Sequence, residues 1–296
     1  MRLTCLTTTL SLLALAAPAF AQTTGTLDKV KQSGAITLAY RESSIPFSYL
    51  DDKAQPVGFG HEICMKVVDE VKKATGRTDL KVNLQAVTSA NRIPLLQNGT
   101  IDIECGSTTN NSERGKQVQF AINYFYTGTK FLVKTGTQIK SIEDLKGKTI
   151  VSTTGTTNFK ILRNLNEEKK LGMELLGAKD HAESALMVES GRAVAFGMDD
   201  ILLYGLRASS QNPASLAVVG DPIQVEPYAI MLRKDDPAFK KLVDDTLAGL
   251  MKSGEFTKLY TKWFQSPIPP KGINLNAPMS PELVENLKAL SDKPAT

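Results

Sequence analysis

Short apolar runs alternate along the chain with longer segments in which apolar residues recur every three or four positions. A short apolar run is typical of a buried strand, and the wider spacing is typical of an amphipathic helix. The runs predict strands over residues 35–40, 81–87, 100–105, 117–134, 148–154, 173–179, 193–199, 216–221 and 228–234. The spaced segments predict helices over residues 59–73, 89–99, 141–147, 157–170, 180–190 and 200–209, and a long helix that begins near Asp236. Strands that alternate with helices indicate an α/β protein with parallel sheets.

The alternation occurs twice along the chain, and the two passes share one plan. RIPLLQNGTIDIECGSTT and ALMVESGRAVAFGMDD each hold a helix, a Gly and an apolar strand that ends in a polar loop. SGAITLAYRES and GKTIVSTTGTT are similar to each other in the same way. We therefore expect two α/β lobes, with the chain crossing between them near residues 124–129 and 220–228. Residues 26–127 and 226–296 would form a discontinuous first lobe, and residues 128–225 the second.

The N-terminus has the three parts of an export signal. Arg2 supplies a positive start, residues 10–17 an apolar centre, and Ala19-Phe20-Ala21 an A-x-A cleavage site. We expect residues 1–21 to be a signal peptide that is cleaved after Ala21. No other run approaches the ~18 apolar residues of a membrane span. The sequence therefore predicts a soluble, periplasmic protein.

The composition argues against several classes of protein. Apolar residues make up 42% of the chain and charged residues 22%, which excludes a disordered protein. The net charge of +4 is mild and Lys and Arg form no cluster, so we expect no binding to nucleic acid. Because the chain has two histidines and its acids are scattered, we expect no metal and no cofactor. Cys64 and Cys105 remain after export, and a disulfide or two buried thiols fit the sequence equally well.

Polar side chains follow most of the predicted strands. In an open α/β sheet, ligands bind beyond the carboxyl ends of the strands, often at helix N-termini. Arginines, hydroxyls, a histidine and carboxylates stand at these positions, among them Arg41, Ser89, Arg92, Ser107, Thr109, Arg114, Thr156, Thr157, His181, Asp199 and Asp200. This set suits a small ligand with two anionic groups and one cationic group.

Each of these features also has a plainer explanation when it is taken alone. Arg41 and Arg92 would be ordinary surface arginines. Asp199 and Asp200 open a helix, where the helix dipole favours acids whatever their function. TTGTT is typical of a helix N-cap loop, and it lacks the Gly-Lys-Ser/Thr ending of a phosphate-binding P-loop. The combination of all of them at strand ends is what favours a binding site.

Several longer stretches resemble the solute-binding proteins of polar amino acid ABC transporters, and among these the glutamate/aspartate binders. The resemblance runs from about Leu27 to Pro270, and its most specific stretches include RESSIPFSY, TSANRIPLLQNGTIDIECGSTTNNSERGKQ, DLKGKTIVSTTGTT, ESGRAVAFGMDD and KWFQSPIPPK. It implies a two-lobed Venus-flytrap fold, the type II periplasmic-binding-protein fold, with a parallel-rich sheet in each lobe. It also implies L-glutamate or L-aspartate as the ligand, an inner-membrane ABC permease as the partner, a monomer and no catalysis.

The resemblance gives roles to three residues at the α-carboxylate of such a ligand and adds a fourth, Thr156, as a contact of the ligand. Arg114 matches the arginine that pairs with this group, and Thr109 and Thr157 match hydroxyls that donate to it from either lobe. A guanidinium suits the task because it offers two parallel donors to a carboxylate, which a lysine cannot do.

Six further candidates are expected at the α-ammonium and at the side-chain carboxylate of the ligand. Asp199 and the carbonyl group of Ser107 match the partners of the α-ammonium. The side-chain carboxylate is expected in a pocket made by Arg41, Ser89, Arg92 and His181. Burial of a ligand with two carboxylates requires paired charges and hydrogen bonds around it.

One departure from the family pattern and one alternative function stand beside this interpretation. The family has a Gly-aromatic-acid-x-acid pattern after the first strand, and GFGHEI keeps Glu62 while Gly60 replaces the first acid. The alternative is an exported enzyme of the same fold, similar to a dehydratase, that acts on a small carboxylic acid. In that case His181 or Glu104 would have to serve as its acid or base.

Overall fold

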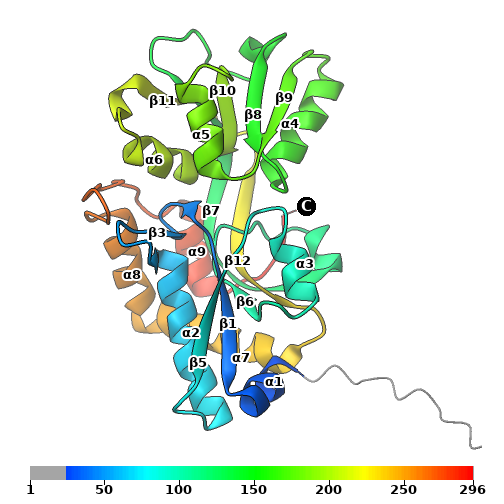
Figure 1. The fold of residues 1–296 in the computed structure, drawn as a ribbon, viewed down its shortest axis with the longest axis vertical. Helices are drawn as coiled ribbons and strands as arrows, with labels where there is room; N and C mark the ends of the chain where they lie inside the picture. The colour runs from blue at the N-terminus through cyan, green and yellow to red at the C-terminus, as the bar shows by residue number, and fades with distance from the viewer. Residues whose placement is uncertain (1–24, 296) are drawn as a thin grey trace, which may run out of the picture.

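The computed structural model describes residues 25–295 (Figure 1). The predicted signal peptide and its cleavage site lie outside the described residues. The strands are β1 (Ala35–Tyr40), β2 (Ser43–Ser44), β3 (Ser48–Leu50), β4 (Pro56–Val57), β5 (Lys81–Ala86), β6 (Ile103–Glu104), β7 (Val118–Lys134), β8 (Thr149–Thr153), β9 (Glu174–Ala178), β10 (Ala195–Asp199), β11 (Leu216–Val219) and β12 (Val225–Arg233). The helices are α1 (Thr26–Ser33), α2 (Phe59–Thr75), α3 (Arg92–Gln97), α4 (Thr157–Glu168), α5 (His181–Glu189), α6 (Asp200–Ser209), α7 (Pro237–Ser253), α8 (Glu255–Phe264) and α9 (Pro281–Ala289).

Two sheets with the same plan lie at opposite ends of the molecule (Figure 1). In the first sheet, β1 pairs in parallel with β5 on one side and with β6 on the other, and β6 pairs antiparallel with β12. In the second sheet, β8 pairs in parallel with β9 and with β10, and β10 pairs antiparallel with β7. The internal similarity of the sequence therefore corresponds to a repeated arrangement of strands. The expected two-lobed α/β architecture is confirmed.

β7 and β12 run between the two lobes. β7 is 17 residues long; β12 pairs with its first part, and β10 and β11 pair with its last part. In the ladder of β7 and β12, Glu226 lies opposite Thr127 and Val225 lies opposite Gly128. Figure 1 shows both strands passing from the lower lobe to the upper one. This pairing supports lobe boundaries at residues 127/128 and 225/226, which stay a prediction.

Aromatic side chains pack the first lobe close to these crossing strands. Phe125 stacks on Phe264 with ring centroids 5.1 Å apart, and Phe47 meets Phe125 edge to face at 4.9 Å. Trp263 and Phe264 are buried, as expected for the end of α8. Aromatic pairs of this kind stabilise a core beyond the area that they bury. The C-terminal part of the chain therefore belongs to the core of the first lobe.

Several elements differ from their predicted bounds, among them α3, which is shorter than the helix expected over residues 89–99, and the helix from Asp236, which ends at Ser253 and is followed by α8. The strand expected over residues 100–105 is reduced to β6, because the buried carboxylate of Asp102 accepts hydrogen bonds from the Thr37 N–H group and from Lys29 Nζ. The helix expected over residues 141–147 is a single 3-10 turn over residues 143–145, where Asp144 accepts from the Ser141 N–H group. α1, α9 and the small sheet of β2, β3 and β4 were not predicted.

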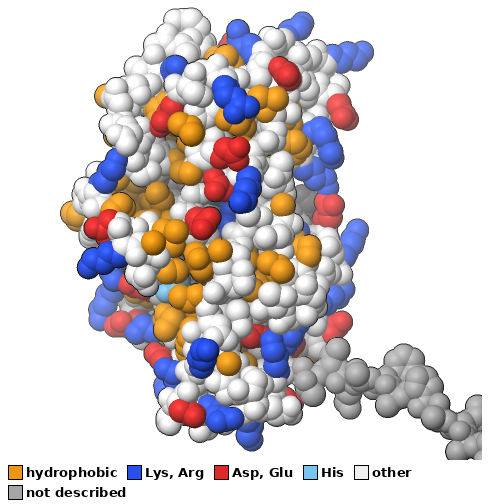
Figure 2. Space-filling model, viewed as in Figure 1, with side chains coloured by type: hydrophobic (Ala, Val, Ile, Leu, Met, Phe, Trp, Pro, Cys, Tyr) orange, Lys and Arg blue, Asp and Glu red, His pale blue; other side chains and the backbone are white. Residues whose placement is uncertain are grey.

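The described surface carries charges of both signs. Figure 2 shows Lys and Arg side chains interspersed with Asp and Glu on the face in view, without a large area of one sign. Such a mixture is unlike the one-signed patch that binds nucleic acid. Between residues 25 and 295, none of the helices combines the length and the apolar character that a membrane crossing requires.

Candidate functional site

A small cavity lies between the lobes, beyond the carboxyl ends of β5, β6, β8, β9 and β10. In this closed arrangement its side chains leave a free volume of about 10 Å³. Its walls are formed by Ser89, Arg92, Ser107, Thr109, Arg114, Thr156, Thr157, Asn158, His181, Met198, Asp199 and Leu202. Nine of the ten residues expected from the sequence are in this set, and the tenth, Arg41, is hydrogen-bonded to two of them. The structure thus brings the candidates together at one place.

Arg41, Ser89 and His181 form a buried network at one end of the cavity. Arg41 Nη2 donates to Ser89 Oγ at 2.9 Å and lies 3.2 Å from His181 Nε2. Because a guanidinium only donates, His181 Nε2 is the acceptor, and the ring proton is on Nδ1. His181 Nδ1 then donates to Thr153 Oγ1 at 2.9 Å. Burial, and after it the charges of Arg41 and Arg92, lower the pKa of His181 well below its usual range, so the ring is neutral.

Arg92 and Glu104 form a second buried pair at the same end. Arg92 Nη1 lies 3.9 Å from Glu104 Oε1 and donates to the carbonyl group of Ser107 at 3.4 Å. The other carboxylate oxygen of Glu104 accepts a hydrogen bond from the Thr108 hydroxyl. Three buried atoms of this cluster, Arg41 Nη1, Arg92 Nε and Glu104 Oε1, have no hydrogen-bond partner among the described residues. Unpaired buried donors are costly, so this end of the cavity is suited to an additional acceptor.

Arg114 stands at the other end and connects the lobes. Its Nη1 donates to the Thr109 carbonyl group at 3.0 Å, and its Nη2 donates across the cleft to the Gly155 carbonyl group at 3.1 Å. Burial, with a further contribution from Arg92, lowers the pKa of Arg114 to about 10. Arg114 therefore stays a cation at neutral pH.

Hydroxyl groups from both lobes meet beside Arg114 at one carboxylate. Thr109 Oγ1 donates to Glu226 Oε2 at 2.9 Å, and Thr157 Oγ1 donates to the same oxygen at 2.6 Å. Thr156 instead caps α4, since its hydroxyl accepts from the Phe159 N–H group and donates to the Thr153 carbonyl group. The lobes are closed on each other in this arrangement, with Glu226 on the crossing strand β12 joining them.

Asp199 is a buried carboxylate without a cation at hydrogen-bond distance among the described side chains. Asn158 Nδ2 donates to Asp199 Oδ1 at 2.9 Å, and the Tyr228 hydroxyl donates to Oδ2. Burial is the main cause that raises the pKa of Asp199 to about 7, and the charge of Glu226 adds to it. Burial also raises the pKa of Glu226. A cation placed beside Asp199 would favour its ionised form.

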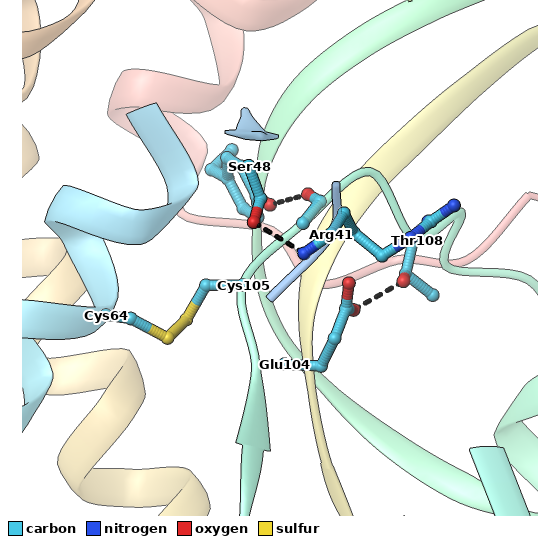
Figure 3. The surroundings of a disulfide bond; sticks show 8 residues. Arg41, Ser48, Cys64, Glu104, Cys105 and Thr108 are labelled. Atoms are coloured by element: carbon cyan, nitrogen blue, oxygen red, sulfur yellow. Dashed lines mark hydrogen bonds between the residues drawn. A yellow bond between two sulfur atoms is a disulfide. The ribbon is translucent and has the colours of Figure 1, made fainter. Parts of the chain in front are cut away.

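Cys64 and Cys105 form a disulfide that ties α2 to the end of β6 (Figure 3). Their Cα atoms are 5.8 Å apart, and both side chains are buried. The close approach also accounts for Gly60, because a Cβ there would lie 2.2 Å from the Cys105 carbonyl oxygen. The acid that the family has at this position would find no room beside the disulfide. Gly60 is not part of the cavity walls, so the departure from the family pattern leaves the cavity unaffected.

The comparisons with known proteins agree with this geometry. Residues 36–266 match the model of the bacterial extracellular solute-binding proteins, family 3. The chain belongs to this family. The two sheets with the same plan and the cavity between them are thus those of a solute-binding protein. The expected type II fold is confirmed.

Two curated relatives and one solved structure show how close the likeness is. An L-glutamate/L-aspartate-binding protein of Pseudomonas aeruginosa is 52% identical over 95% of this chain and 94% of its own length. A glutamate/aspartate import solute-binding protein of Escherichia coli is 50% identical over 90% of this chain and 89% of its own length. The crystal structure of a mutant of ArgBP from T. maritima superposes with a TM-score of 0.73 at 25% identity, over 81% of this chain and 99% of that one. Both curated relatives are named as binding proteins rather than enzymes, which favours the main interpretation over the dehydratase alternative.

Some residues of the solute-binding cavity were missed from the sequence. Asn158, Met198 and Leu202 line the cavity, and Glu226 and Tyr228 bond to residues that do. Asn158 follows the TTGTT stretch directly, so its place in the loop was a usable signal. Glu226 was not a candidate because it lies in the predicted crossing segment and does not follow a predicted strand, whereas the structure includes it in β12. Across the described part of the chain, His, Cys, Asp and Glu side chains nowhere gather in threes as metal ligands would.

Proposed function

We propose that this solute-binding protein captures L-glutamate or L-aspartate between its lobes and delivers it to an inner-membrane ABC permease. The observation that carries the proposal is the distribution of charge in the cavity. Guanidinium groups lie at both ends of the cavity, Arg92 at one and Arg114 at the other. Asp199 lines the cavity as well, and among the described residues it has no cationic partner at hydrogen-bond distance. An acidic amino acid has the complementary set of groups. The names of the two curated relatives support the same ligands.

The α-carboxylate and α-ammonium of the ligand would bind beside Arg114 and Asp199. Arg114, Thr109 and Thr157 would donate to the carboxylate, and Thr156 would stand next to it. Asp199 and the carbonyl group of Ser107 would accept from the ammonium. Thr109 and Thr157 now donate to Glu226, so they would have to turn from that carboxylate toward the ligand.

The side-chain carboxylate would bind at the end with Arg41, Ser89, Arg92 and His181. Arg92 Nε and Arg41 Nη1 are the donors with spare capacity there. His181 would act by holding Arg41, because its Nε2 accepts from that guanidinium. A neutral His181, bonded through both ring nitrogens, also lacks the free proton position that the dehydratase alternative needs.

Closure of the lobes would couple binding to transport. The groups around the ligand come from both lobes, so its binding free energy favours the closed form that a permease could recognise. The lobes would consist of residues 26–127 with 226–296 and of residues 128–225. Further parts of this proposal are a monomer, no binding to nucleic acid, and a periplasmic location after cleavage behind Ala21. N-terminal sequencing of the exported protein tests the cleavage.

Two arginine variants test the ligand assignment. Isothermal titration calorimetry would compare Arg92→Ala and Arg114→Ala with the wild type, using glutamate, aspartate and glutamine. Arg92→Ala should lose the preference for acidic over amide side chains, whereas Arg114→Ala should abolish binding of every amino acid. Arg163→Ala is the matched control, because this arginine is exposed on α4. Near-native glutamate affinity in a folded Arg92→Ala protein would refute the side-chain pocket.

A further inference from the structure

Glu104 is a buried carboxylate placed directly behind the arginines of the side-chain pocket. It is fully buried at the end of β6, and its Oε1 lies 3.9 Å from Arg92 Nη1. In Figure 3 its carboxylate points toward the Arg41 side chain and accepts from Thr108. Sequence considerations named this residue only as a catalyst of the enzyme alternative, and the proposed function leaves it without a task.

The surroundings of Glu104 hold its carboxylate at this place. The Thr108 hydroxyl donates to one oxygen, and the disulfide of the next residue, Cys105, fixes the end of the strand. Gly106 leaves room for the group, because a Cβ there would lie 2.2 Å from Glu104 Oε1. A carboxylate that is buried away from water normally requires an opposite charge nearby. Arg41 and Arg92 supply that charge.

The charges at this end of the cavity can be counted. Arg41 and Arg92 are both buried cations; burial, and then Arg92, lower the pKa of Arg41 to about 9, while Glu104 and Asp180 oppose the shift. His181 is neutral, as its lowered pKa requires. Asp180 is the partly exposed N-cap residue of α5, whose side chain accepts from the Glu183 N–H group. Among the buried groups, two cations and one anion leave a net charge of +1 around the pocket, since Asp180 is partly exposed to solvent.

We infer that Glu104 is a specificity-determining residue, which sets the net charge of the side-chain pocket so that it takes a singly charged group. The inference rests on the proposed function of this cavity. One carboxylate neutralises a pocket of charge +1, whereas a doubly charged group would leave an uncompensated negative charge in a low-dielectric site. Glu104 thus excludes phosphorylated or phosphonate side chains by charge rather than by size.

The test uses two ligands of equal shape and different charge. They are two glutamate analogues, in which a sulfonate or a phosphonate replaces the side-chain carboxylate. The sulfonate is singly charged. The phosphonate is doubly charged at a pH above its second pKa. Their dissociation constants would be measured by competition against glutamate in the wild type and in Glu104→Gln. The variant should shift the ratio of the two constants toward the phosphonate by about tenfold or more, which corresponds to about 1.4 kcal/mol. Glu70→Gln, on a half-buried residue of α2 that pairs with Lys73, should leave the ratio unchanged.

The outcomes separate this inference from the proposed function. If the wild type binds neither glutamate nor aspartate, the proposed function fails. If glutamate binds and Glu104→Gln weakens both analogues equally, Glu104 has only a structural role and the inference fails.

A second measurement needs no variant. As the pH is lowered from about 8 to about 6, the phosphonate takes up a proton, and its binding to the wild type should strengthen relative to sulfonate binding. A constant ratio there would also overturn the inference. If neither analogue binds, stabilisation by inorganic sulfate should appear in Glu104→Gln and not in the wild type, and equal responses would contradict the charge count.

Discussion

Glu104 and Asp199 are buried carboxylates at corresponding places in the two lobes, yet their surroundings differ. Glu104 ends β6 and Asp199 ends β10; β6 pairs in parallel with β1, and β10 pairs in parallel with β8. Glu104 lies beside Arg92 and keeps one oxygen without a hydrogen bond. Asp199 accepts from Asn158 and Tyr228, with neutral donors at both oxygens.

The difference assigns opposite tasks to the two carboxylates. Glu104 already has its cations, so it adjusts the charge that they present to a ligand. Asp199 has hydrogen bonds but lacks a cation within the described site, and the proposed ligand ammonium would supply one. A repeated fold therefore uses the same strand end once to balance its own charge and once to receive the charge of a ligand.

The largest effect that separates the two residues is expected from Asp199→Asn. The amide keeps an oxygen for Asn158 and an amino group for Tyr228, so the fold should be retained. The ammonium of the ligand would lose its charged partner, and such a loss costs about 2–5 kcal/mol. Glutamate affinity measured by calorimetry should fall about thirtyfold or more. Glutamate affinity close to that of the wild type would show that Asp199 does not receive the ammonium.

The disulfide is a second difference, since Cys105 anchors the Glu104 end and nothing comparable follows Asp199. Its cysteines are 41 residues apart in the sequence. A disulfide that closes a loop of this length lowers the conformational entropy of the unfolded chain. Removal of such a bond lowers the free energy of unfolding by about 2–4 kcal/mol. The double variant Cys64→Ser, Cys105→Ser should lose this free energy of unfolding in urea titrations. A reductant should destabilise the wild type by a similar amount and leave the double variant unchanged; an unaffected wild type would contradict the structural role.

The strand-end rule explains how much of the cavity the sequence revealed. Residues placed just after a strand, such as Arg41, Ser107 and His181, could be found because parallel strands bring their carboxyl ends to one edge. The elements that were found have strong periodicity; α6 spans residues 200–209, the range that was predicted.

Other features depended on contacts between distant segments and left no local signal. Glu226 lies within a strand, and only the pairing of β12 with β7 brings it to Thr109 and Thr157. The pairing of Cys64 with Cys105 likewise follows from the approach of α2 to β6. β6 itself is shorter than its apolar alternation suggested, because the side chain of Asp102 bonds to the neighbouring strand.

A pH dependence of stability should reveal the protonated Asp199 in the ligand-free protein. Burial and Glu226 raise the pKa of Asp199 to about 7, while Asp200 and Tyr228 also face it. The folded protein therefore holds a proton there that the unfolded chain releases near about pH 4. This stabilisation is complete below that pH and is lost as the pH rises toward 7. The free energy of unfolding of the wild type, relative to Asp199→Asn, should fall from about pH 4 to about pH 7.

Ligand binding should reverse this protonation. An ammonium beside Asp199 favours the carboxylate, so glutamate binding near pH 6 should release a proton, and binding above about pH 8 should not. Calorimetry in buffers of different ionisation enthalpy measures the release. Glu104→Gln leaves the surroundings of Asp199 intact and should show the same release. Heats that do not depend on the buffer near pH 6 would contradict a protonated Asp199.

The smallest effect on glutamate affinity is expected from the exposed carboxylate of Glu113. It shows how much burial adds to the effects of Glu104 and Asp199. Glu113 pairs with Lys160 of α4, and both side chains are more than half exposed. The pKa of Glu113 is lowered first by its hydrogen bond with Lys160, but solvent and salt screen the interaction. Glu113→Gln should therefore change glutamate affinity less than threefold, and about 0.5 M salt should remove the difference. A loss as large as that of Asp199→Asn would mean that closure of the lobes depends on this exposed pair rather than on the buried charges.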